Sequence, residues 1–198
     1  LPDTLNLVGF KNLRGFHTNR MNIFTALASE ISRALSPDLP KDLGDLNSHL
    51  DFIIPKVIPY GEDLRETHFW LDKRWKEVRE DEGFHESLLH IFGKNGAYML
   101  SLDGNLENGS WQQLGEENAL ILQMGVRKEL FDLRFLNEQF MILTKHGDQA
   151  RKGLPRFVML AHEPITRGRS GELDWRNIME KLFNVWRENS LSIAAWIF

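Results

Sequence analysis

The feature that most constrains this chain is a series of short apolar runs, separated by turn signals, between residues 68 and 146. The runs recur about every ten residues, a spacing typical of up-and-down β-barrels and sandwiches. Asp103-Gly104 is the strongest turn signal, because both central positions of a type I′ turn need a positive φ. Asn108-Gly109 is a second candidate turn. The pattern predicts strands at 74–78, 87–92, 98–102, 110–114, 119–123, 130–133, 140–143 and 157–160.

Helical periodicity flanks this meander. Apolar residues at helical spacing predict a helix over 24–35, and a second short helix over 39–50. Pro55 and Pro59 then indicate an extended connector over 53–58. A C-terminal helix is expected over 174–189 with Asp174 as its N-cap, followed by a short strand over 190–193.

These patterns together predict a mainly β fold with flanking helices (α+β). We expect an antiparallel up-and-down meander of about eight strands that forms a barrel or a strongly bent sheet. N-terminal helices and one C-terminal helix complete it. The expected division is an N-terminal helical segment over 1–60, packed on the barrel, and a β-barrel domain with its C-terminal helix over 61–198.

Composition excludes several classes of function. The 198 residues include no cysteine, which rules out disulfide scaffolds, Cys-ligated zinc, iron–sulfur clusters and thiol catalysis. The net charge of −4 gives no overall attraction to nucleic acid or to an anionic membrane. Seven histidines include no HxH or HxxxH pair, so ordinary surface or hydrogen-bonded histidines are expected and neither a metal nor a cofactor is indicated.

Aromatic residues provide the first candidate site. Thirteen Phe and six Trp stand against two Tyr, and many of them fall in the meander. They either fill the barrel or line an apolar pocket at an end that is left open. The candidates for such a pocket are Trp75, Phe92, Tyr98, Trp111, Phe131 and Phe140.

Basic loops provide a second candidate. Gly168 and Gly171 would let backbone N–H groups approach an anion beside basic side chains. The alternative is two solvated loops. The anion-binding candidates are Arg151, Lys152, Arg167 and Arg169.

The order of elements resembles that of a known superfamily. Consecutive antiparallel strands followed by a helix and a short final strand, with Gly109-Ser110-Trp111 as a Gly-x-Trp motif, resemble the lipocalins and related calycin barrels over roughly residues 68–198. The resemblance implies a barrel whose interior holds a small apolar ligand. The pattern is also similar to pleckstrin-homology-like domains, in which a helix caps a seven-stranded barrel that binds proteins or phosphoinositides.

The expected function is a non-enzymatic binding module for a small apolar ligand or a partner protein. One alternative is an enzyme with a barrel-end site built from His85 or His90 and carboxylates such as Glu86 or Asp132. Another is a soluble interaction domain of a membrane-anchored protein, in which the apolar run at 193–198 begins a span. A cytoplasmic location is slightly favoured, and the oligomeric state is left open.

Overall fold

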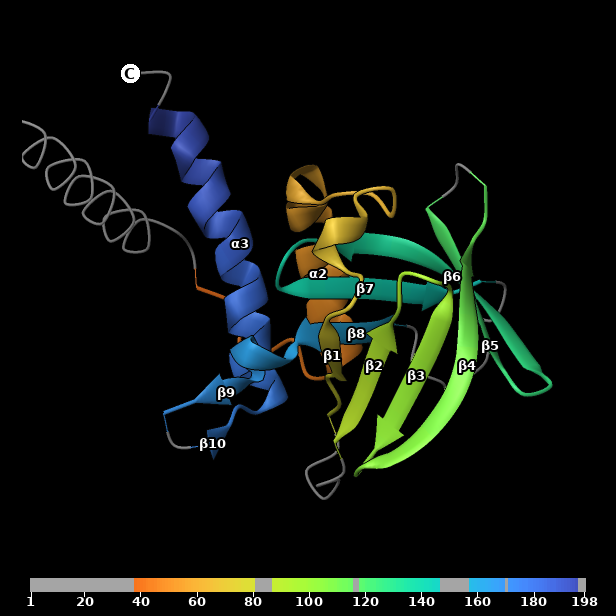
Figure 1. Ribbon diagram of the computed structural model, residues 1–198. Helices are drawn as coiled ribbons and strands as arrows, with labels where there is room; N and C mark the ends of the chain where they lie inside the picture. Colours follow the sequence, from red (N-terminus) through yellow and green to blue (C-terminus); the bar gives the residue numbers. More distant parts are fainter. Residues whose placement is uncertain (1–37, 81–86, 116–117, 147–156, 170, 196–198) are drawn as a thin grey trace, which may run out of the picture.

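The computed structural model describes residues 38–80, 87–115, 118–146, 157–169 and 171–195. Eight antiparallel strands form a closed barrel in the order of the sequence (Figure 1). They are β1 (Arg74–Glu77), β2 (Leu88–Phe92), β3 (Ala97–Leu102), β4 (Asn105–Gln113), β5 (Ala119–Met124), β6 (Arg127–Leu136), β7 (Phe140–Lys145) and β8 (Phe157–His162). The predicted up-and-down barrel is therefore confirmed.

The first and last strands close the barrel by pairing with each other. Trp75 of β1 lies opposite His162 of β8, and Glu77 lies opposite Leu160. Each remaining strand pairs with its neighbours in the chain, and a bulge between Leu133 and Phe135 interrupts the register of β6 and β7. Because side chains alternate across a strand, each strand has an inward and an outward face.

Strand β7 is buried on both faces. Met141 and Leu143 belong to the core inside the barrel, whereas Phe140 and Ile142 belong to a second core on its outer side. The outer core also contains Met159 of β8, and buried side chains of two helices pack on it. The five residues from Phe140 to Thr144 are therefore all buried, and the first four form a continuous apolar run with no alternation of polarity.

Helix α2 (Leu46–Val57) includes part of the segment that contains the two prolines. The extended connector predicted over 53–58 is wrong: Pro55 lies inside the helix, and Pro59 lies in the following 3-10 helix η1 (Ile58–Tyr60). Ile53, Ile54 and Val57 continue the buried helical face, and their burial outweighs the hydrogen bond that Pro55 cannot donate. Asp45 caps the helix by accepting a hydrogen bond from the Ser48 N–H at 2.7 Å.

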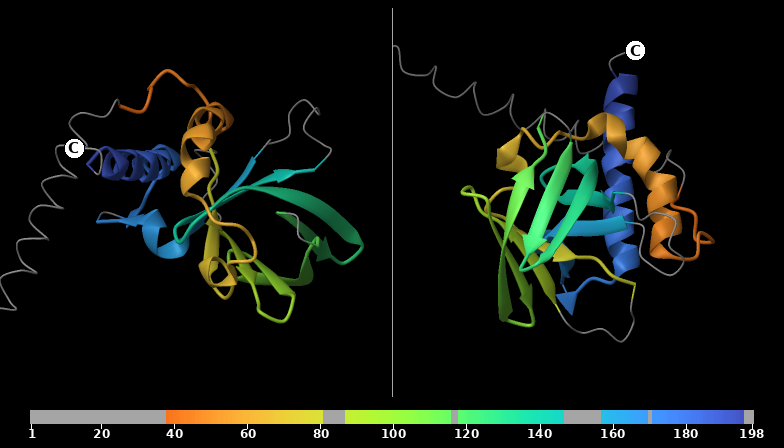
Figure 2. Two further views of the ribbon diagram at one scale, coloured as in Figure 1. Left: turned by 90° about the horizontal axis from the view of Figure 1, so that it is seen from above. Right: turned by 90° about the vertical axis from the view of Figure 1, so that its right-hand side faces the viewer.

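Helix α3 (Trp175–Ala195) packs beside α2 on the same side of the barrel (Figure 2). Asp174 accepts a hydrogen bond from the Asn177 N–H at 2.8 Å, which agrees with its predicted role as N-cap. The strand predicted over 190–193 is wrong, because the helix continues to Ala195. None of the helices in the described ranges combines the length and the apolarity needed to cross a membrane.

Of the two turns predicted from Asx-Gly pairs, one is confirmed and the other is wrong. Asp103 and Gly104, with φ of 48° and 86°, form the predicted turn between β3 and β4. Asn108-Gly109 is not a turn but lies inside β4, where β5 comes very close. A Cβ on Gly109 would lie 2.3 Å from the carbonyl oxygen of Gln123, so only glycine fits there without movement of the backbone.

A segment between α2 and β1 closes one end of the barrel. It contains the 3-10 helix η2 (Thr67–Phe69) and makes hydrogen bonds to three separate parts of the barrel rim. The N–H of Glu62 donates to Leu136, that of Leu64 to the Asn118 side chain, and that of Asp72 to Phe92.

Trp70 forms the plug of this closed end. Its indole is fully buried and donates a hydrogen bond to the carbonyl oxygen of Leu64. The indole contacts the rings of Phe92 and Trp111 edge to face, with ring centroids 5.4 and 4.7 Å apart. Leu120 and Leu136 complete the same core. The interior is therefore tightly filled at this end.

Outside the barrel, a short ladder precedes α3. The 3-10 helix η3 (Glu163–Thr166) leads into β9 (Arg167–Gly168), which pairs with β10 (Gly171–Glu172). Lys76 of β1 forms an ion pair with Glu172 at 2.5 Å, which connects this ladder to the barrel wall.

Candidate ligand-binding site

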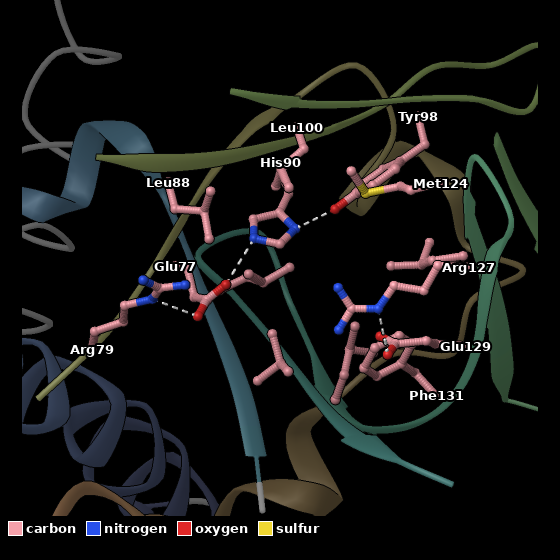
Figure 3. A pocket seen from close by; sticks show the side chains of 14 residues that line it. Glu77, Arg79, Leu88, His90, Tyr98, Leu100, Met124, Arg127, Glu129 and Phe131 are labelled. Carbon is pink, nitrogen blue, oxygen red and sulfur yellow. Dashed lines mark hydrogen bonds and ion pairs between the residues drawn. The ribbon is translucent and has the colours of Figure 1, made fainter. Parts of the chain in front are cut away.

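A cavity of about 280 Å³ occupies the other end of the barrel interior (Figure 3). Its lining comes from every barrel strand except β4, together with Arg79 just beyond β1. Most of the lining side chains are apolar, and they are Leu88, Leu100, Leu122, Met124, Phe131, Leu143, Val158 and Leu160. The barrel is thus filled at one end and hollow at the other.

Strand alternation explains why polar side chains also reach this cavity. Glu77 follows the inward-facing Trp75 by two residues, and His90 lies between the buried Leu88 and Phe92 at the same period. Tyr98 enters from β3, which pairs with β2. Three neighbouring strands therefore direct three titratable side chains to one wall.

These side chains form a continuous hydrogen-bonded chain. Tyr98 Oη lies 2.7 Å from His90 Nδ1, and His90 Nε2 lies 3.0 Å from Glu77 Oε2. The Arg79 guanidinium donates from Nε to Glu77 Oε1 at 2.8 Å. Figure 3 shows this chain running along one side of the cavity. Every one of these side chains is buried or half-buried.

The charges of this wall follow from its partners. Burial alone would raise the pKa of Glu77, but its hydrogen bonds with His90 and Arg79, together with the positive charge of the Arg79 guanidinium, outweigh burial and hold that pKa below its usual value. Burial, with the nearby Glu77 and Glu129 carboxylates, raises the pKa of the Tyr98 phenol. The wall therefore combines an ionised carboxylate with a phenol that keeps its proton.

A second polar group lies across the cavity. Glu129 Oε1 accepts hydrogen bonds from Arg127 Nε at 3.0 Å and from Lys145 Nζ at 2.9 Å. Burial acts to raise the pKa of Glu129, but the Lys145 and Arg127 partners lower it overall. The Arg127 side chain is 75% exposed, so this group belongs to the rim of the cavity, where water competes for it.

The predicted aromatic residues fall into three groups. Tyr98 and Phe131 line the cavity. Trp75 and Phe92 are fully buried in the filled end, and Trp111 of β4 is half-buried against the Trp70 plug. Phe140 faces the helices in the outer core.

The basic candidates do not gather at the cavity. Arg151 and Lys152 lie outside the described residues. Arg169 is exposed, and Arg167, also exposed, pairs with Glu163 at 3.0 Å beside the β9–β10 ladder.

Of the residues considered for catalysis that fall in the described ranges, His90 lines the cavity and Asp132 does not. His85 and Glu86 lie outside the described residues. Asp132 lies on the outward side of β6 and contacts His146 at 3.0 Å, with both side chains substantially exposed.

In the sequence, Glu77 belongs to an acidic run with Glu80, Asp81 and Glu82, beside basic residues. A carboxylate pair for acid–base work is conceivable there, but a solvated strand edge is the preferred interpretation, so Glu77 is not among the predicted site residues. The alternation of side chains along a strand could have identified both Glu77 and His90. Glu77 shares the inward face of Trp75, and His90 shares the inward face of Leu88 and Phe92. A charged residue on an otherwise apolar face is a better indicator of a site than the charge run itself.

Comparisons of the chain with protein-family models, curated proteins and solved structures found no match.

Proposed function

We propose that this protein is a non-enzymatic binding module that holds a small apolar ligand in the open half of its barrel. The observation that carries the proposal is the cavity of about 280 Å³, lined mainly by apolar side chains and bearing one ordered polar wall. Ligand pockets of proteins have this make-up, with a mostly apolar lining and a few fixed polar groups, and begin at about 300 Å³. The cavity therefore suits a small ligand.

The resemblance to lipocalins supports the same function. The closed barrel of eight antiparallel strands is about the size that can hold one ligand. The Gly-x-Trp segment adds less support, because Gly109 and Trp111 lie on β4 and serve strand contact and the packing of the Trp70 plug. The proposal therefore depends on the cavity and not on the motif.

Binding of an apolar fluorescent probe tests the proposal. We expect saturable binding of 1-aminoanthracene, one molecule per chain, and a loss of affinity of about tenfold or more in Leu122→Trp, whose larger side chain fills the cavity. Leu106→Trp is the matched control, because Leu106 of β4 is 63% exposed and lies outside the cavity. Absence of saturable binding, or equal loss in both variants, would refute the proposal.

A second candidate function is acid–base catalysis, which the meeting of Tyr98, His90 and Glu77 in one cavity favours. A histidine oriented by a carboxylate is a common general base. Both nitrogens of His90 are already engaged, however, and no Ser, Thr or Cys is among the described residues that line the cavity. His90 could therefore act only through Tyr98.

Turnover of an apolar ester separates the two candidates. A catalytic site predicts that His90→Asn lowers kcat for p-nitrophenyl decanoate by at least about a hundredfold. A binding module predicts a slow reaction that the substitution leaves unchanged.

A further inference from the structure

We infer that the cavity selects apolar molecules that carry a neutral hydrogen-bond donor, an alcohol above all, and that Tyr98 Oη accepts the ligand's hydrogen bond. This inference rests on the proposed function, because it names the class of ligand for the same cavity. It follows from the direction of the hydrogen bonds along the polar wall, which begins at the charged Glu77 and ends at Tyr98.

The direction is set at Glu77. Both of its oxygens lie within hydrogen-bond distance of a nitrogen, Oε1 of Arg79 Nε at 2.8 Å and Oε2 of His90 Nε2 at 3.0 Å. An ionised carboxylate has no proton and can only accept. Nε2 of His90 must therefore carry a hydrogen and donate it to Glu77.

The tautomer of His90 then decides the role of Tyr98. A neutral imidazole has one N–H group, so Nδ1 presents a lone pair when Nε2 is the donor. Tyr98 Oη lies 2.7 Å from Nδ1, and the phenol therefore donates its only hydrogen to His90. What remains on the oxygen of Tyr98 is the capacity to accept.

That acceptor has no second protein partner in the described part of the chain, where Tyr98 makes one side-chain hydrogen bond. Tyr98 is 2% exposed, and its neighbours on the cavity wall include the apolar Leu100 and Met124. A buried acceptor facing a cavity binds a group that brings its own hydrogen, because an unpaired polar contact in such surroundings costs free energy.

A carboxylate ligand is disfavoured at the same place. It has no hydrogen to donate to Tyr98, and the ionised Glu77 two steps along the chain repels it. Two guanidinium groups line the cavity, but Arg79 pairs with Glu77, and the Arg127 side chain is largely exposed to water. An ether has the size of the alcohol but lacks the hydrogen.

Three probes of matched length test this selectivity. Calorimetric titration at about pH 8.5 compares 1-decanol, its isomer 1-methoxynonane, and decanoate. We expect 1-decanol to bind about fivefold more tightly than either of the others, the value of one hydrogen bond. In Tyr98→Phe the alcohol should lose this advantage while the affinity for the ether is kept.

The matched control is Tyr60→Phe, which removes the hydroxyl of the other tyrosine, outside the cavity, and should leave all three affinities unchanged. If Tyr98→Phe fails to fold, Glu77→Gln serves as the second variant. An amide side chain can donate or accept, so it no longer fixes the tautomer of His90. The preference for the alcohol over the ether should then shrink.

Equal affinities for alcohol and ether, tightest binding of decanoate, or a preference that survives in these variants would overturn the inference while leaving the binding function standing. Binding of none of the three probes would overturn both.

Discussion

The indole Nε1 of Trp75 donates a hydrogen bond to the carbonyl oxygen of Trp70 at 2.9 Å. This bond joins the first barrel strand to the segment that closes the barrel, and both indoles are fully buried. The closed end and the barrel wall therefore share one buried core, and the cavity lies beyond it.

Truncation of the plug tests this arrangement. Trp70→Ala should lower the free energy of unfolding by about 3–5 kcal/mol, because it removes a buried indole and leaves a void between Phe92 and Trp111. Urea unfolding measures the change. Val126→Ala, at a fully exposed turn, is the control and should stay within about 0.5 kcal/mol of the wild type. A similarly small loss in Trp70→Ala would show that the plug does not stabilise the barrel.

The close contact at Gly109 gives a second prediction. Gly109→Ala should lower the free energy of unfolding by about 1–3 kcal/mol, since the new methyl group would meet the carbonyl oxygen of Gln123. Ser110→Ala at the next, exposed position of β4 should be nearly neutral. Equal thermal unfolding temperatures for the two variants would contradict the contact.

The ionised Glu77 predicts a pH dependence of stability. Its pKa in the folded protein lies below the ordinary value of 4.5, so its contribution is present above that value and is lost as the pH falls through the folded pKa. Glu77→Gln should cost about 1–3 kcal/mol near neutral pH, and the difference from the wild type should shrink as the pH falls below the ordinary range of a carboxyl pKa.

Urea unfolding of both proteins over this pH range measures the effect. The exposed Glu107→Gln is the control and should change stability by less than about 0.5 kcal/mol. A difference between wild type and Glu77→Gln that grows as the pH falls would contradict the assignment of the charge.

Removal of Pro55 should stabilise the protein. Pro55 is exposed inside α2, and alanine would restore a backbone donor and remove a steric clash. Proline also restricts the unfolded chain, which offsets part of this gain, so we expect Pro55→Ala to raise the free energy of unfolding by roughly 2 kcal/mol. Pro59→Ala, at the start of η1, should not stabilise. Denaturant midpoints compare the two variants, and destabilisation by Pro55→Ala would show that the helix depends on the proline.

The sequence predicted the strands better than the helices. Each of the eight predicted strands overlaps an observed one, because β-periodicity and turn chemistry are local properties. The segment around Pro55 and the end of α3 were predicted wrongly, because local signals there are overridden: by burial of Ile53, Ile54 and Val57 in α2, and by continuation of α3 to Ala195.

The candidate site was predictable only in part. Tyr98 and Phe131 were named as aromatic residues of the predicted meander, and both line the cavity. Which aromatics would fill the barrel and which would border a hollow depends on the Trp70 segment crossing one end, a contact between distant parts of the chain. The chain from Tyr98 to Glu77 likewise needs three strands in register, which no single run of residues encodes.

The most direct test of the central claim, that the hollow end of the barrel binds an apolar ligand, is titration of methyl-labelled protein with 1-decanol followed by NMR. We expect shifts of the methyl groups of Leu100, Leu122 and Leu160, which line the cavity, and none for Leu50 and Leu182 in the outer core. Shifts confined to the outer core or to exposed methyl groups such as that of Val126, or no shifts at all, would contradict it.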